Sequence, residues 1–173
     1  GGGWTLGSQA AGSGETLVID AEYHDPYSTK FAYVGAANIT YKGSDRELSG
    51  NDTVVLGSGN DTVTLNQGAD VITGGAGNDT IDGGVGVDIA IFSGNKSDYT
   101  ITETGYGQYQ VVDNRSSGSD GTDGLTSVET LRFADQDFDI TPAGMTISNA
   151  GQGTLTSITG VNGTPLTSQV VGA

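Results

Sequence analysis

A period of nine residues in the middle of the chain constrains its fold more than any other feature. Five units follow one another without a gap over residues 47–91: ELSGNDTVV, LGSGNDTVT, LNQGADVIT, GGAGNDTID and GGVGVDIAI. The sixth position is always aspartate, namely Asp52, Asp61, Asp70, Asp79 and Asp88. The fourth position is always glycine, namely Gly50, Gly59, Gly68, Gly77 and Gly86. Self-similarity at a fixed period indicates a stacked, solenoid-type architecture.

The residue type at each of the repeated positions has a physical reason. Glycine lets backbone carbonyls turn towards a common point, which a Cβ would obstruct. Aspartate places a hard oxygen ligand on a short side chain, and the Val, Ile or Ala two positions later begins a short strand with one inward side chain. We therefore predict an all-β fold, a parallel β-roll in which two units make one coil and acidic loops line both edges.

This geometry sorts the aspartates into two rows. Loops that are 18 residues apart lie over one another, so Asp52, Asp70 and Asp88 share one edge while Asp61 and Asp79 share the other. Neighbouring coils are about 4.8 Å apart. Two carboxylates at that spacing repel each other by roughly 3–4 kcal/mol at an effective dielectric constant near 20. The stack therefore needs a cation between its aspartates.

Calcium is the cation that suits such loops. It accepts carboxylate and carbonyl oxygens in a flexible cage, whereas magnesium requires tighter octahedral geometry and zinc prefers nitrogen and sulfur. The chain has no cysteine and one histidine, which excludes thiolate and imidazole-rich zinc sites. One ion between each pair of stacked loops predicts three calcium sites: Asp52 with Asp70, Asp70 with Asp88, and Asp61 with Asp79.

Composition restricts the classes of partner that the chain can bind. The formal net charge is −15, with only 6 Lys and Arg, which argues against nucleic acid or an anionic membrane as a partner. No segment approaches the ~20 apolar residues of a membrane helix, so no membrane insertion is expected. Hydrophobic residues make up 34% of the chain and glycine contributes 30 residues, so something other than a large core must stabilise the fold.

The five units resemble the glycine- and aspartate-rich nonapeptide of repeats-in-toxin (RTX) proteins. GGAGNDTID and GGVGVDIAI match the pattern in full, whereas the three earlier units lack the Gly-Gly pair at their first two positions. The resemblance implies a calcium-binding β-roll whose ligands are aspartate side chains and main-chain oxygens of the loops. The glycines concerned are those of the fourth column together with Gly57, Gly75 and Gly84.

The resemblance extends downstream of the repeats. Residues 88–140 are similar to the segment that closes many β-rolls of secreted bacterial proteins. Within it, YTIT and YQVVD are expected to form antiparallel strands around a turn at Gly105–Gly107, and VETLRFAD (residues 128–135) alternates like a strand. The cluster SDGTDGL, with Asp120 and Asp123, is compatible with a further calcium site and equally with an Asx-type turn.

Four segments are expected. Residues 1–46 form an amino-terminal β cap or the end of a preceding domain, 47–91 the calcium β-roll, 92–140 a β-rich carboxy-terminal cap, and 141–173 an uncharged tail. In the first segment TLVID and FAYVGAANITY are expected to be strands. Its aromatic group is interpreted as cap packing, with a sugar-stacking platform as the alternative: Tyr23, Tyr27, Phe31, Tyr33 and Tyr41.

The tail, residues 141–173, contains no charged residue. It reads either as a flexible tail or, by the RTX resemblance, as an uncleaved signal for type I secretion. His24 is the single histidine and lies in a polar loop, so no HExxH zinc-protease motif exists in this chain. The sequence offers no nucleophile–base pair and no catalytic carboxylate pair.

The predicted function is a non-catalytic, calcium-binding RTX module of a secreted or cell-surface bacterial protein. It would fold on calcium binding outside the cell and support type I secretion of a larger adhesin, surface-layer protein or enzyme. The alternative is a calcium-dependent polysaccharide-binding module, similar to accessory modules of some alginate-modifying enzymes. The few scattered basic residues weaken that alternative.

Overall fold

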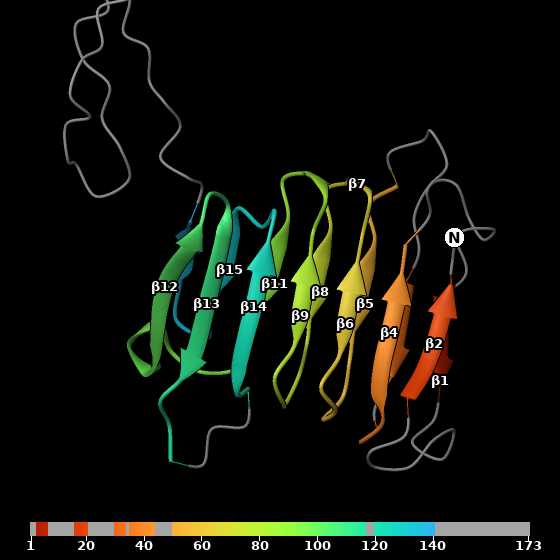
Figure 1. Cartoon of the computed structure of the whole chain (residues 1–173), viewed down its shortest axis with the longest axis horizontal. Coiled ribbons are helices and arrows are strands. Elements are labelled where there is room, and N and C mark those ends of the chain that lie inside the picture. Colours follow the sequence, from red (N-terminus) through yellow and green to blue (C-terminus); the bar gives the residue numbers. More distant parts are fainter. Residues whose placement is uncertain are drawn as a thin grey trace, which may run out of the picture.

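The chain forms two parallel-stranded layers that face each other across a narrow core (Figure 1). The computed structural model describes residues 3–6, 16–20, 30–33, 35–43, 50–116 and 120–140. One seven-stranded sheet has, in spatial order, β1 (Gly3–Leu6), β3 (Lys30–Tyr33), β5 (Thr53–Val55), β8 (Val71–Thr73), β11 (Ile89–Ile91), β15 (Thr130–Arg132) and β16 (Asp137–Asp139).

The second seven-stranded sheet runs along the opposite side of the roll. Its spatial order is β12 (Tyr99–Gly105), β13 (Gln108–Asp113), β14 (Thr122–Thr126), β9 (Thr80–Asp82), β6 (Thr62–Thr64), β4 (Asn38–Lys42) and β2 (Thr16–Asp20). Two short strands, β7 (Gln67–Gly68) and β10 (Val85–Gly86), pair along one loop edge. A 3₁₀ turn covers Lys96–Asp98. In the described part of the chain, no helix is long and apolar enough to cross a membrane.

The strand register confirms that two nonapeptides make one coil. Thr53 of β5 pairs with Val71 of β8, Val71 pairs with Ile89 of β11, and Thr62 of β6 pairs with Thr80 of β9. All of these pairs are parallel and join residues that are 18 apart. The all-β, parallel β-roll predicted from the period of nine is therefore confirmed.

The inward side chains of the repeat form the core of the roll. The eighth-column residues are at most 2% exposed: Val54, Val63, Ile72, Ile81 and Ala90. Leu56 and Leu65, which stand where the full repeat pattern has its first glycine, are also buried, at 5% and 2% exposure. The early units thus exchange a loop glycine for apolar surface in the core, which contributes stability in proportion to the area buried.

The roll begins before the first nonapeptide. FAYVGAANITY was expected to be one strand, but it forms two, β3 and β4, which lie in opposite sheets and pair in parallel with β5 and β6. The bend over residues 35–37 separates them, and it stacks on the loop of Gly57–Gly59 through the hydrogen bond from Ser58 N–H to Gly35 O. TLVID forms β2, as predicted.

The aromatic residues of this coil lie inside the roll. Phe31, Tyr33 and Tyr41 are at most 4% exposed, and Phe31 stacks on Tyr41 with ring centroids 5.0 Å apart. A sugar-stacking platform made of these three rings is therefore wrong, because a sugar cannot reach them. Tyr23, Tyr27 and His24 lie outside the described residues, as do Glu47, Leu48 and the uncharged tail.

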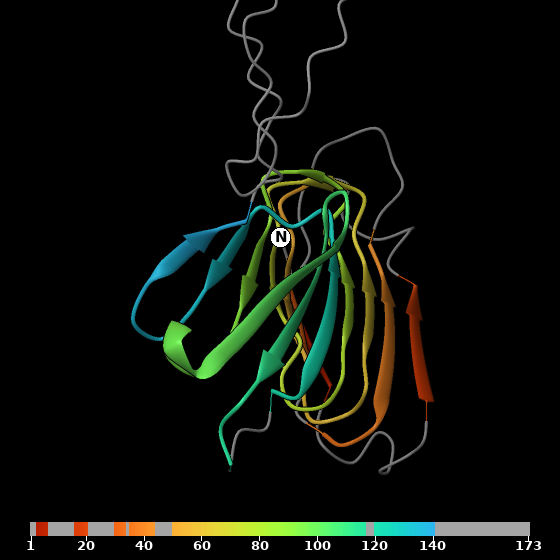
Figure 2. The same ribbon diagram turned by 60° about the vertical axis from the view of Figure 1, so that its left-hand side comes forward.

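A hairpin and three further strands, β14, β15 and β16, close the carboxy-terminal end (Figure 2). β12 and β13 pair antiparallel around the turn predicted at Gly105–Gly107, and β14 and β15 then extend both sheets in parallel with β9 and β11. The predicted strand over 128–135 is shorter than expected, since only Thr130–Arg132 pair with β11. The chain turns where Phe133 N–H donates to Gln136 O. Val128 and Phe133 are therefore both buried, although one continuous strand would place them on opposite faces.

The stacking of loops explains why Gly77 has to be glycine. Its φ is +119°, and a Cβ on it would overlap the Gly59 carbonyl oxygen of the coil below. We expect Gly77→Ala to lower the free energy of unfolding of the calcium-loaded chain by about 2–3 kcal/mol, because the strain and the overlap add. Gly124→Ala is the matched control, since the nearest atom to a Cβ there is Asp79 O at 4.0 Å. Urea unfolding of the two variants measures both effects, and equal loss in both would contradict the stacking argument.

Candidate metal centre

The five repeat aspartates occupy one structural position, the last loop residue before a strand. They directly precede β5, β6, β8, β9 and β11. Asp61, Asp70, Asp79 and Asp88 are at most 2% exposed, and Asp52 is 8% exposed. Burying this many carboxylates is costly unless each charge is compensated.

Hydrogen bonds join the aspartates into the two predicted rows. Asp52 N–H donates to Asp70 Oδ1 at 2.6 Å, and Asp70 N–H donates to Asp88 Oδ1 at 2.8 Å. On the other edge Asp61 N–H donates to Asp79 Oδ1 at 2.9 Å. The sorting of the aspartates by multiples of 18 residues is therefore confirmed.

In four of these carboxylates the second oxygen has no hydrogen-bond partner in the protein. The Oδ2 atoms of Asp61, Asp70, Asp79 and Asp88 are buried, and none of them accepts a hydrogen bond. A buried polar atom without a partner carries its full desolvation penalty. Four such atoms at repeated positions fit a bound cation, which supplies the missing compensation.

The pKa values of these carboxyls also show that their buried negative charge lacks compensation. Burial raises the pKa of Asp79 and of Asp88 to about 7, and that of Asp70 to about 6, with the neighbouring aspartate of the row adding to the effect. Burial also raises the pKa of Asp61. Hydrogen bonds from the backbone oppose the shift at each of these groups but do not cancel it. The metal-free rows therefore favour a positive charge, either a proton or a metal ion.

Main-chain carbonyls crowd the same loops. A Cβ on any of the stacked glycines would overlap a carbonyl oxygen of the preceding coil; these glycines are Gly57, Gly59, Gly68, Gly75, Gly77 and Gly86. The carbonyl oxygen that a Cβ on Gly68 would overlap is that of Gly50. A Cβ on Gly84 would lie 2.5 Å from the carbonyl oxygens of Leu65 and Asn66. The described residues contain no group of three Asp, Glu, His or Cys side chains that could hold a metal. Paired carboxylates supplemented by carbonyl oxygens are a hard-oxygen donor set of the kind that calcium prefers.

A ladder of asparagines beside the aspartates was not predicted. Asn60 N–H donates to Asn38 Oδ1 at 2.9 Å, and Asn78 N–H donates to Asn60 Oδ1 at 2.8 Å. These bonds point towards the amino terminus of the roll, whereas those of the aspartates point away from it. Asparagine at the fifth position of three units was the available signal.

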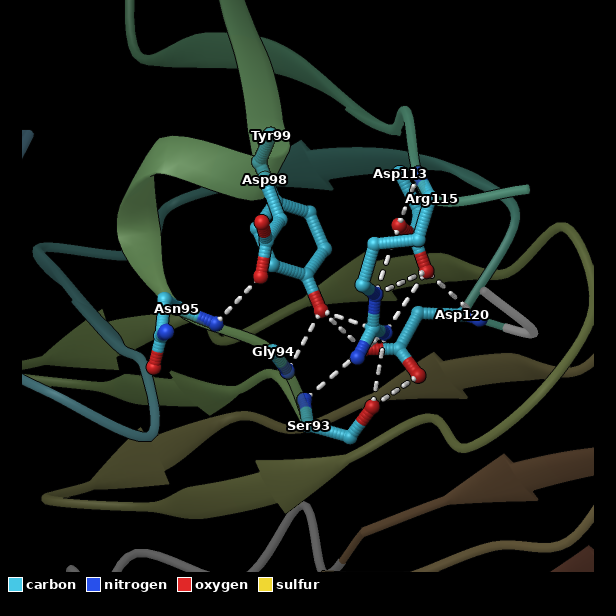
Figure 3. Close-up of polar contacts among 8 residues, drawn as sticks. All are labelled: Ser93, Gly94, Asn95, Asp98, Tyr99, Asp113, Arg115 and Asp120. Atoms are coloured by element: carbon cyan, nitrogen blue, oxygen red, sulfur yellow. Dashed lines mark hydrogen bonds and ion pairs between the residues drawn. The ribbon is translucent and has the colours of Figure 1, made fainter. Parts of the chain in front are cut away.

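Asp120 and Asp123, which the sequence grouped together, lie in different environments. Asp120 accepts hydrogen bonds from Ser93 N–H and from the Tyr99 hydroxyl, and its Oδ2 lies 3.5 Å from the Arg115 guanidinium (Figure 3). Arg115 also pairs with Asp113 at 2.7 Å. Asp120 therefore belongs to a network, compensated by protein groups, that fastens the hairpin to the roll. Asp123 lies at the end of an aspartate row, where Asp79 N–H donates to its Oδ1 at 2.8 Å.

The fold and the site thus define the class of protein: a parallel β-roll with two rows of buried carboxylates. Residues 48–63 and 57–90 match the family model of the RTX calcium-binding nonapeptide repeat, in four copies. This segment of the chain is an RTX calcium-binding repeat module. Comparisons with curated proteins and with solved structures found no significant match.

Proposed function

We propose that this chain is a non-catalytic folding module that becomes ordered when it binds calcium outside the cell. In this role it supports the type I secretion of a larger bacterial adhesin, surface-layer protein or enzyme. The observation that carries the proposal is the set of buried carboxylate oxygens without a protein partner in both rows. Such a structure is poorly stable without a cation and stable with one.

The residues that would hold calcium are those of the stacked loops. On one edge they are Asp52, Asp70 and Asp88, and on the other Asp61 and Asp79, with main-chain carbonyl oxygens of the loop glycines completing each set. Calcium supplies the positive charge that offsets the buried carboxylates. The chain itself supplies the spacing, because the strand register holds the loops of each edge in one stack.

The calcium concentration on each side of the cell envelope determines how much this binding stabilises the fold. Extracellular calcium modules have dissociation constants of ~10⁻⁴–10⁻³ M. At about 1 mM calcium and a dissociation constant near 10⁻⁴ M, each site stabilises the folded state by about 1.4 kcal/mol. Free calcium in a cytosol is far lower, so this stabilisation is absent there. A chain that stays unfolded until it leaves the cell can be exported as a thread.

Burial of aromatic rings removes one argument for the glycan-binding alternative, the sugar-stacking platform. Three of its five aromatic residues are buried in the roll. Among the described basic residues, Arg115 pairs with Asp113 and Arg132 with Asp137, at 2.7 Å and 2.9 Å. These guanidinium groups are already engaged, and we do not propose this function.

The test is the size of the chain as a function of calcium. At pH 8 we expect size-exclusion chromatography to show an expanded chain at about 100 nM free calcium. At about 1 mM calcium we expect a compact one, because the sites are of the extracellular type. Magnesium at the same concentration is the control, and it should not produce the compact form, because its octahedral preference does not suit the loops. A compact chain in the presence of a chelator would contradict the proposal.

A further inference from the structure

The two carboxylate rows do not end with the repeats. Asp79 N–H donates to Asp123 Oδ1 at 2.8 Å, and Asp88 N–H donates to Glu129 Oε2 at 2.8 Å. These bonds repeat the pattern within the repeats, where each aspartate N–H donates to the carboxylate of the next coil. Asp123 and Glu129 follow their partners by 44 and 41 residues instead of 18, because the hairpin β12–β13 is inserted between the coils.

The loop at Asp123 reproduces the geometry of a repeat loop. Gly121 has a φ of +81°, and a Cβ on it would overlap Gly77 O and lie 2.8 Å from Asn78 Oδ1. Gly77 has the same relation to the coil below, where a Cβ would overlap Gly59 O and lie 3.0 Å from Asn60 Oδ1. Thr122 N–H continues the asparagine ladder by donating to Asn78 Oδ1 at 2.8 Å. Residues 121–126 therefore form a loop and strand equivalent to a repeat unit.

The loop before Glu129 faces an unpartnered oxygen. Asp88 is fully buried, and its Oδ2 has no hydrogen-bond partner. A Cβ on Gly83 would lie 2.8 Å from that Oδ2 and would overlap the carbonyl oxygen of Ser127. Ser127 has a φ of 51° and is the one non-glycine residue with positive φ in the described part of the chain. This conformation is costly for serine. It places the Ser127 carbonyl oxygen and Asp88 Oδ2 within 2.8 Å of one point, the position that a Cβ on Gly83 would take.

We propose that Asp123 and Glu129 carry the calcium rows onto the carboxy-terminal cap, as ligands of two ions beyond those of the repeats. The inference rests on the proposed calcium function. The gaps between successive carboxylates are then five: Asp52/Asp70, Asp70/Asp88, Asp88/Glu129, Asp61/Asp79 and Asp79/Asp123. The cap is thereby tied to the roll by the same ions that hold the coils together.

Counting bound ions tests this inference. Native mass spectrometry of the full chain with calcium is expected to show five ions, one for each gap. Asp123→Asn and Glu129→Gln keep a side-chain oxygen that accepts the same backbone N–H, so the fold is retained while the charge is lost. Each variant is expected to bind one ion fewer than the parent chain, and the double variant two fewer.

The controls separate this inference from the proposed function. Asp139→Asn and Glu103→Gln make the same chemical changes at exposed cap positions and should leave the count unchanged. A parent chain that binds three ions, or an unchanged count in both Asp123→Asn and Glu129→Gln, would overturn the extension of the rows. A parent chain that binds no calcium would instead overturn the proposed function. The count on the parent chain does not depend on the folding of any variant.

Discussion

Asp79→Asn is expected to stabilise the metal-free chain and to destabilise the calcium-loaded chain. Asp79 is 2% exposed, and burial raises its pKa to about 7. Asparagine keeps the oxygen that accepts Asp61 N–H and removes the buried charge. At pH 8 without metal we expect the free energy of unfolding to rise by about 1–2 kcal/mol, less than the full relief of the charge because a buried amide N–H₂ replaces Oδ2.

With calcium the sign of the effect reverses. Asp79 borders two gaps of its row, with Asp61 on one side and Asp123 on the other. Loss of ligand charge at two sites, each contributing about 1.4 kcal/mol at ~1 mM calcium, lowers the free energy of unfolding by up to about 3 kcal/mol. Without calcium, folding driven by an osmolyte such as TMAO measures the change, and with calcium urea unfolding measures it. Glu103→Gln is the exposed control. The same sign under both conditions would show that Asp79 is not a metal ligand.

Acidification is expected to replace part of the stabilisation that calcium provides. The folded metal-free chain holds carboxyls whose pKa values are raised by burial: Asp70 to about 6, Asp79 and Asp88 to about 7, and Asp123 to about 8. In the unfolded chain these groups return to the ordinary value of 3.8. Between these values the folded state binds more protons than the unfolded state, so its stability is highest at low pH and is lost as pH rises.

The pH window of this effect follows from the same values. From pH 5 to pH 8 we expect the metal-free chain to lose roughly 5–10 kcal/mol of unfolding free energy, since each of the four carboxyls contributes 1.36 kcal/mol for every pH unit over which it is protonated only in the folded state. With saturating calcium the dependence should weaken or reverse, because protons then compete with the metal. The folded fraction by circular dichroism in chelator, and thermal unfolding in calcium, each at pH 5 and at pH 8, check the two statements. Greater metal-free stability at pH 8 than at pH 5 would mean that the buried carboxylates are compensated by the protein alone.

The part of the fold that sequence could predict is the part with an unbroken period. Five aspartates at a spacing of nine residues predicted the coil of 18, the two rows and the inward position of residues such as Val63 and Ile72. Each of these properties depends only on local spacing and on the alternation of side chains along a strand. A fixed period determines the register between stacked strands, so the pairing of strands that are 18 residues apart could be predicted directly.

The part that sequence could not predict lies where the period breaks. The coil of β3 and β4 pairs with the next at offsets of 23 and 22 residues, and Ile39 stands where a repeat has aspartate. Asp123 and Glu129 are separated from their rows by the length of the hairpin. Such insertions are tolerated because lengthening a surface loop costs little free energy. They change the number of residues between stacked positions, so the period of nine no longer shows which residues stack. The burial of Leu56 and Leu65 was missed because their column was judged only by its missing glycines.

Hydrogen exchange measured strand by strand, with and without calcium at pH 8, tests the central claim that calcium compensates the buried carboxylate rows. The amide protons of Asp61 and Asp70, which donate to the next aspartate of their rows, and those of the repeat strands β5, β6, β8, β9 and β11 are the reporters. We predict strong protection of these amides in calcium and little protection in chelator, because the rows then lack their counter-charge. Equal protection of the repeat strands in both conditions would contradict the account.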